Sequence, residues 1–246
     1  MNKVMMHGAL VVFLLMAQLV FGQSERETIR TSARQVDLNQ HAPEEIQNLF
    51  PGAKESIVML GGRKESRQLN YNLLLDYFYY SDARGNIRWV GPNDADSIHI
   101  GEFLFHSFPE EGFFEVVPET PGLLVKHMVD VSTETLTRGA YGTTDETASI
   151  EVLRGLTTAT EGLGTSHTAY LENPGGQELR ITLKREKKFY LLIDGRPGDV
   201  SNRRALQRAF PDHRRDIRRF VRQHDIDFAR QADMVKVLDF IRSIEK

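Results

Sequence analysis

Short strand-like segments follow one another through residues 57–131 with no helical pattern between them, and this succession constrains the fold most strongly. Apolar and polar residues alternate within the segments, and Gly, Pro and acidic turn residues separate them. Parallel strands need long crossover connections, usually helices, and the gaps here are too short to supply them. The pattern therefore predicts an antiparallel meander.

The longest of these segments, residues 69–80, alternates along its whole length and is interpreted as one half-buried strand. The turn residues DARGN separate it from IRWV, so these two segments are expected to form a hairpin. Further strands are predicted in the segments IVML, DSIHI, EFLFHSF, GFFEVVP and LLVKHMVDV.

The last part of the chain has a different pattern. ELRITL and KFYLLI are predicted to form a β-hairpin joined by KREK, and three short helices follow. Ser201 is expected to cap the first helix, the second is expected to start at Asp212 after Pro211, and the third is expected over residues 231–244. The fold class is therefore α+β, with an antiparallel β-meander-rich N-terminal part followed by a β-hairpin and three short C-terminal helices.

Composition divides the chain into five parts. These are a signal peptide at 1–22, a flexible leader with a short helix at 23–56, the β-rich region at 57–131, a Thr/Gly/Ser-rich loop or linker at 132–178, and the β-hairpin with the helical region at 179–246.

The first residues predict export. Lys3 precedes an apolar run at residues 9–17, and Val20 and Gly22 place small residues before a cleavage point. That run is too short to cross ~30 Å of hydrocarbon as a helix, and no second apolar segment follows. We therefore expect a periplasmic or extracellular protein, cleaved near Gly22, whose mature chain has no transmembrane segment.

The chain contains no cysteine and carries a net charge of −3. The lack of thiols excludes cysteine nucleophiles, thiolate zinc sites and iron–sulfur clusters. The small net charge provides no overall attraction to nucleic acid or anionic lipid.

The stretch RRDIRRFVRQ concentrates arginine on one side of a predicted helix, opposite Ile217, Phe220 and Val221. The candidate anion-binding residues are Arg214, Arg215, Arg218, Arg219 and Arg222. They form either a solvated helix face or a binding patch, and the sequence leaves both open. The arginine side carries no aromatic residues, which argues against a surface that stacks nucleic-acid bases.

Charge is distributed unevenly around this helix. Residues 180–230 contain 15 Lys and Arg against 7 Asp and Glu, a net charge of +8 that leaves −11 for the rest of the chain. Such polarity would either steer an anion toward the C-terminal part or dock the two parts of the chain together.

Catalytic signals are weak. His127 lies on the apolar face of its segment and is expected to be a hydrogen-bonded core histidine. GLGTSHT around Ser166 lacks the closing glycine of a nucleophile elbow, and NDADS around Asp94 fails the calcium-loop pattern and predicts a turn. We therefore nominate no catalytic, metal-binding or cofactor-binding residue, expect no cofactor, and expect that the protein is not an enzyme.

Several motifs resemble a family of uncharacterised secreted proteins of Bacteroidota-type bacteria, over about two thirds of the chain. The matching residues are Tyr141 and Gly142, then Leu206, Phe210, Pro211 and Ile217, then Ile226 and Phe228. The resemblance implies an envelope or secreted protein and implies no activity.

Together these features favour an exported, non-enzymatic binding or scaffolding protein of the bacterial envelope, whose partner is a protein or an anionic envelope component. One alternative is a protein that binds an anionic partner through its arginine-rich C-terminal helices. Another is a hydrolase whose site assembles from distant residues.

Overall fold

The structure is a computed structural model, and it describes residues 26–138, 144–145 and 169–245. The expected signal peptide, the Tyr141 and Gly142 motif and Ser166 lie outside the described residues. Of the helices that the structure describes, none has both the length and the hydrophobicity of a membrane-spanning helix.

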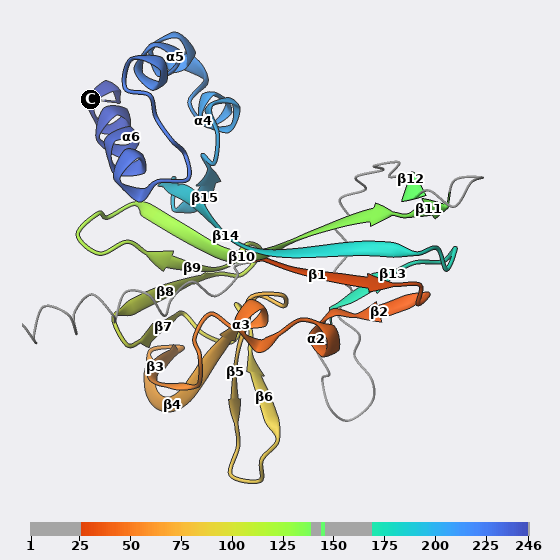
Figure 1. Ribbon diagram of the computed structural model, residues 1–246. Helices are drawn as coiled ribbons and strands as arrows, with labels where there is room; N and C mark the ends of the chain where they lie inside the picture. The colour runs from red at the N-terminus through yellow and green to blue at the C-terminus, as the bar shows by residue number, and fades with distance from the viewer. Residues whose placement is uncertain (1–25, 139–143, 146–168, 246) are drawn as a thin grey trace, which may run out of the picture.

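One large antiparallel sheet dominates the fold (Figure 1). Its strands are β1 (Arg26–Thr31), β3 (Lys54–Leu60), β4 (Arg63–Asn72), β5 (Tyr77–Ser81), β6 (Ile87–Val90), β7 (Ser97–Ile100), β8 (Phe103–Phe108), β9 (Gly112–Val116), β10 (Leu123–Thr135), β14 (Leu179–Ile193) and β15 (Arg196–Asp199). The order is β1-β14-β10-β9-β8-β7-β3-β4-β5-β6, and β15 also pairs with β14. Runs of sequence neighbours lie side by side in this order, which confirms the predicted antiparallel arrangement.

The remaining elements are short or lie at the C-terminal end. Two small sheets pair β2 (Gln35–Asp37) with β13 (Tyr170–Glu172) and β11 (Thr137–Arg138) with β12 (Thr144–Asp145). The helices are α2 (Leu38–His41), α3 (Glu44–Gln47), α4 (Arg203–Ala209), α5 (Arg214–Gln223) and α6 (Gln231–Ile244), with a 3₁₀ turn at Pro211–His213. In Figure 1, α4, α5 and α6 gather at one end of the sheet.

Two hydrophobic cores lie along the β10–β14 pair. The first contains an aromatic cluster, Tyr71, Phe78, Phe105 and Phe113, in which the Tyr71 and Phe78 ring centroids are 4.6 Å apart. The second packs Leu123, Val125, Phe189 and Leu191 of the strands against Leu206, Ile217 and Leu238 of the helices. The C-terminal helices are therefore attached to the sheet by burial of apolar side chains.

The prediction of one strand over residues 69–80 is wrong. The chain turns after Asn72, whose side-chain oxygen accepts hydrogen bonds from the Leu74 and Leu75 amides at 3.0 and 3.1 Å. Asp76 completes the turn with a left-handed φ of 60°. Such side-chain bonds let Asn stabilise a turn inside an apolar run, which an alternation pattern does not reveal.

The predicted flexible leader is also corrected, because β1 pairs with residues 179–184 of β14. Its sequence has little apolar periodicity, but the edge of β14 supplies backbone partners and Ile29 packs against the first core. Strand β10 likewise continues to Thr135, beyond the expected boundary at residue 131.

The prediction of a hairpin between ELRITL and KFYLLI is wrong, because KREK does not form a turn. Residues 179–193 are one continuous strand, β14, because β10 offers it thirteen register partners without interruption. The turn lies at Asp194 and Gly195, whose φ angles of 50° and 78° match a two-residue hairpin loop, and β15 follows it.

All three predicted helices are present, and α6 has the expected bounds. Asn202, rather than Ser201, caps α4, because its side-chain oxygen accepts the Ala205 amide at 3.0 Å. Val237, Leu238 and Ile241 form the buried face of α6.

A partly buried polar cluster holds the β4–β5 turn against the long strands. The Asp76 carboxylate contacts the Tyr71 hydroxyl and the Lys126 ammonium, and Lys126 also donates to the Glu111 carbonyl at 3.0 Å. Burial lowers the pKa of Lys126, while the neighbouring Asp76 opposes that shift. Gly112 leaves room for the cluster, since a Cβ there would overlap both the carboxylate and the ammonium.

We predict that Gly112→Ala costs at least ~3 kcal/mol in the free energy of unfolding, measured by urea denaturation. The new methyl group would displace the Asp76–Lys126 pair at a backbone φ of 94°. Gly101→Ala is the control, because its φ of 60° is also left-handed but its Cβ would meet no atom within 4 Å. That control should cost only ~1 kcal/mol, and an equal cost for both variants would contradict the steric argument.

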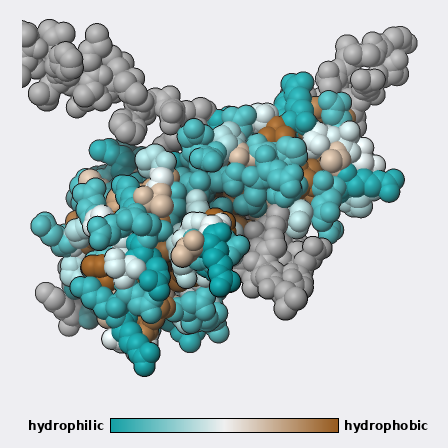
Figure 2. Space-filling model, turned by 90° about the horizontal axis from the view of Figure 1, so that it is seen from below, coloured by the Kyte–Doolittle hydropathy of each residue, from teal (hydrophilic) through white to brown (hydrophobic). Residues whose placement is uncertain are grey.

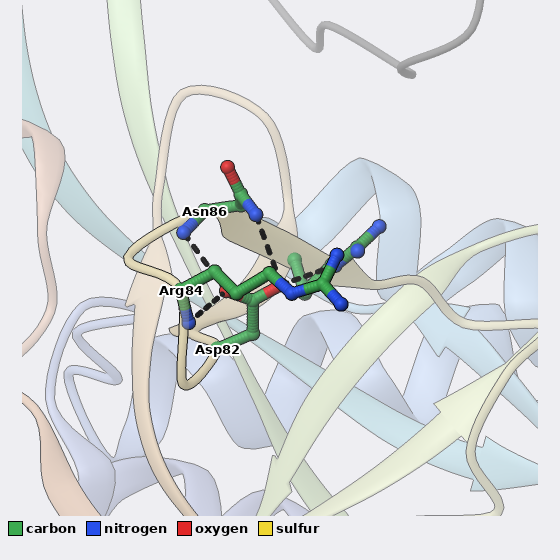
Figure 3. Close-up of polar contacts among 4 residues, drawn as sticks. Asp82, Arg84 and Asn86 are labelled. Carbon is green, nitrogen blue, oxygen red and sulfur yellow. Dashed lines mark hydrogen bonds and ion pairs between the residues drawn. The ribbon is translucent and has the colours of Figure 1, made fainter.

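The β5–β6 hairpin closes through Asp82 (Figure 3). Its carboxylate accepts the Arg84 and Asn86 amides, both at 2.9 Å, the Asn86 side-chain amide at 3.3 Å and the Arg88 guanidinium at 3.1 Å. These bonds, led by the Asn86 amide, lower the pKa of Asp82 from 3.8 to about 2. Ionised Asp82 therefore stabilises the turn.

Because the folded pKa of Asp82 is lowered, its contribution is complete above pH ~4 and is lost as the pH falls through about 2. We expect Asp82→Asn to destabilise the protein at pH 6, and the difference from the parent protein to shrink toward pH 2. Urea denaturation at several pH values measures this difference. A difference that is constant from pH 6 to pH 2 would contradict the assignment.

Candidate anion-binding site

The part of the surface that the structure describes exposes few large apolar side chains. Figure 2 shows a face that is mostly hydrophilic, with hydrophobic residues in small separate patches. Among the large apolar side chains that the structure describes, Ile87 and Leu192 are the exposed ones. Recognition is therefore expected to depend on polar and charged groups.

Helix α5 is amphipathic, as predicted. Ile217 is fully buried, and Phe220 stacks on Phe240 of α6 with ring centroids 4.2 Å apart. All five arginines of the predicted patch are exposed: Arg214, Arg215, Arg218, Arg219 and Arg222.

Two of these arginines join two others from α4 around a concave site, here called the arginine hollow. It has a volume of about 650 Å³ and is lined by Asn202, Arg204, Gln207, Arg208, Arg214 and Arg218. Each helix contributes an arginine pair at i and i+4, so both guanidinium groups of a pair lie on one face of the helix. No acidic residue contributes to the lining.

Side-chain-to-backbone hydrogen bonds hold the two helices around the arginine hollow. The Gln207 side chain donates to the Arg214 carbonyl at 2.9 Å, and Arg214 Nε donates to the Gln207 carbonyl at 3.3 Å. Leu206 and Ile217 anchor the two helices in the second core. Within the described part of the chain, no hydrogen bond or ion pair engages the guanidinium groups of Arg204, Arg208 and Arg218. These three groups are therefore available to a ligand.

The other three predicted arginines, Arg215, Arg219 and Arg222, do not line the hollow. Arg219 forms a solvent-exposed ion pair with Asp216 at 3.6 Å, a type worth ~0–1 kcal/mol. The sequence reading missed Arg204 and Arg208. Their spacing of four, opposite the inward-facing Leu206, was the signal that could have identified them.

His127 is a hydrogen-bonded core histidine, as predicted. Its side chain is 4% exposed, and its Nε2 contacts the Glu115 carboxylate. His127 and Ser201 both line a second concave region beside β14. The described hydrogen bonds of the Ser201 hydroxyl do not include His127, so these residues do not form a catalytic pair in this structure.

The other candidates have structural roles or stay apart. Asp94 accepts the Gly91 amide at 2.8 Å and forms a turn, as predicted. His99 and His106 lie on neighbouring strands, and burial together with His99 lowers the pKa of His106. Over the described ranges, no three metal-ligating side chains come together.

No protein-family model, curated protein or solved structure matches this chain. A functional proposal therefore depends on the geometry and chemistry of the arginine hollow.

Proposed function

We propose that this is an exported, non-enzymatic binding protein of the bacterial envelope, and that the arginine hollow binds clustered phosphate or sulfate groups of an anionic envelope component. The observation that carries the proposal is the convergence of Arg204, Arg208, Arg214 and Arg218 on one concave site whose lining contains no acidic residue. Such a concentration of positive charge is unfavourable by itself and becomes favourable when an anion binds.

The residue type indicates the ligand. A guanidinium group presents a planar fork of donors that matches two oxygens of a phosphate or sulfate group. The arginine hollow is concave and small, which suits a compact polyanion better than a flat protein surface. The phosphorylated headgroup of a lipopolysaccharide has this chemistry.

The charge distribution supports the same proposal. The net charge of +8 over residues 180–230 lies in the part of the chain that forms the hollow, and the rest carries −11. A field with this polarity would guide an anion to the C-terminal helices and away from the remaining surface.

Export is supported by the N-terminal pattern and by the resemblance to secreted proteins. We expect the protein recovered from a Gram-negative host to lie outside the cytoplasm and to begin near Gln23, as determined by mass spectrometry of its N-terminal peptide. Recovery of the cytoplasmic chain with Met1 intact would contradict export without affecting the binding proposal.

The binding proposal predicts that Arg204→Glu combined with Arg218→Glu weakens binding of inorganic tripolyphosphate at least ~100-fold. Each substitution removes charge-assisted hydrogen bonds worth ~1.5–3 kcal/mol and introduces repulsion. Isothermal titration calorimetry at 50 mM NaCl measures the affinity, and the same titration at 300 mM NaCl should show steep weakening for the parent protein.

The matched control is Arg215→Glu combined with Arg219→Glu, which changes the charge equally on the same surface but outside the arginine hollow. We expect this control to lose less than fivefold in affinity. Equal losses for the two double variants would show a diffuse charge effect and overturn the assignment of the hollow.

A further inference from the structure

The arginine hollow adjoins another cavity, here called the hairpin groove, whose volume is about 520 Å³. Arg208 lines both cavities, so the two meet at one guanidinium side chain. The hairpin groove is lined by Ile193, Arg196, Pro197, Gly198, Asp199, Ala205, Arg208 and Ala209.

Helix α4 and the β14–β15 hairpin form the walls of the groove, and β15 lies beside α4 (Figure 1). Ile193 pairs with Arg196, and Leu191 pairs with Gly198. Directly paired residues point to the same face of an antiparallel sheet, so these four residues share one face of the hairpin. Because Leu191 belongs to the second core, this is the face on which the C-terminal helices pack.

The walls of the groove are largely apolar, in contrast to those of the arginine hollow. Ala205 and Ala209 lie one turn apart on α4, and Ala209 and Ile193 both pack against the second core. Gly198 contributes no side chain, and a Cβ there would lie 2.5 Å from the Ile193 Cδ1 atom. The groove thus presents apolar surface through small and half-buried side chains, and that surface is continuous with the second core. Hydrocarbon gains free energy by leaving water for such walls.

The charged groups of the groove favour a ligand with a negative end. Arg196 is exposed, and within the described part of the chain its guanidinium has no hydrogen bond or ion pair, as is also true of Arg208. Asp199 is the one acid in the lining, and its carboxylate accepts the Ser201 amide at 2.9 Å, within its own turn. Positive charge therefore lies on both sides of the boundary between the hollow and the groove.

From these features we infer that the arginine hollow and the hairpin groove together bind a phosphate-bearing amphiphile. Its phosphate would lie among the arginines of the hollow, and one alkyl or acyl chain would lie along the groove. The inference rests on the proposed function of the hollow and specifies its ligand class. Guanidinium groups match phosphate oxygens, and the adjoining apolar walls match a hydrocarbon chain. A free phosphate compound would use the hollow alone.

A comparison of two phosphate monoesters tests whether the groove takes the chain. Isothermal titration calorimetry with the full chain measures the affinities of dodecyl phosphate and ethyl phosphate, both below the concentration at which micelles form. Dodecyl phosphate should bind at least ~10-fold more tightly, because part of its longer chain leaves water. Equal affinities would overturn the inference, and the tripolyphosphate result would still stand.

Ile193→Asn places a polar group in the groove and should reduce the advantage of dodecyl over ethyl phosphate to less than ~3-fold. Its tripolyphosphate affinity should stay within ~2-fold of the parent, which also shows that the variant folds. If it does not fold, Ala209→Gln makes the same test from α4 with a residue that favours helix. Leu192→Asn is the matched control, because Leu192 is 45% exposed, points to the opposite face and does not line the groove. Equal losses in the control and in Ile193→Asn would overturn the assignment of the groove.

Two further titrations test whether the phosphate and the chain bind as one ligand. The Arg204→Glu and Arg218→Glu double variant should bind dodecyl phosphate at least ~10-fold more weakly than the parent. Uncharged dodecyl maltoside should bind the parent at least ~10-fold more weakly than dodecyl phosphate does. Undiminished binding in either titration would overturn the inference, because the chain would then bind without its phosphate. Self-association of the parent that Ile193→Asn abolishes, with dodecyl phosphate affinity unchanged, would assign the groove to a second copy instead.

Discussion

The pairing of β10 with β14 is the constraint on which the other packing interactions depend. Their thirteen register pairs carry one hydrophobic core at each end, the aromatic core of the meander and the helical core of the C-terminal part. Because both cores use the same two strands, a shift in register would move the inward side chains of both to the opposite face at once. Helices α4 and α5 pack on the β10–β14 pair through the second core. The position of the arginine hollow therefore depends on the register of these two strands.

The polar cluster around Asp76 connects the β4–β5 turn of the meander to strand β10. Strands β9 and β10 share only two register pairs, so backbone hydrogen bonds alone connect the meander weakly to the long ladder. Asp76 reaches Lys126 from the β4–β5 turn and reinforces that connection. Loss of Asp76 would leave the mostly buried Lys126 charge without its partner, which costs more than the pair contributes when intact.

The parts of the fold that the sequence predicted are those determined locally. The meander followed from alternation and turn residues, and α5 and α6 followed from helical periodicity. The turn after Asn72 was missed because a side-chain bond overrides the alternation, and β14 was divided because its partner β10 is distant in sequence. The arginine pattern predicted the exposed face of α5, but only the packing of α4 against α5 shows that Arg214 and Arg218 face Arg204 and Arg208.

The separation of β10 from β14 in the chain has a consequence for the order of folding. Residues 136–178 lie between the two strands, so their pairing must close a long loop before any ladder contact forms. Apart from the β3–β7 pair, the strands from β3 to β9 pair with sequence neighbours and require much shorter closures. We expect the meander to form early. Pairing of β14 with β10 is expected to be the slow step, and the C-terminal helices pack on these strands only after it.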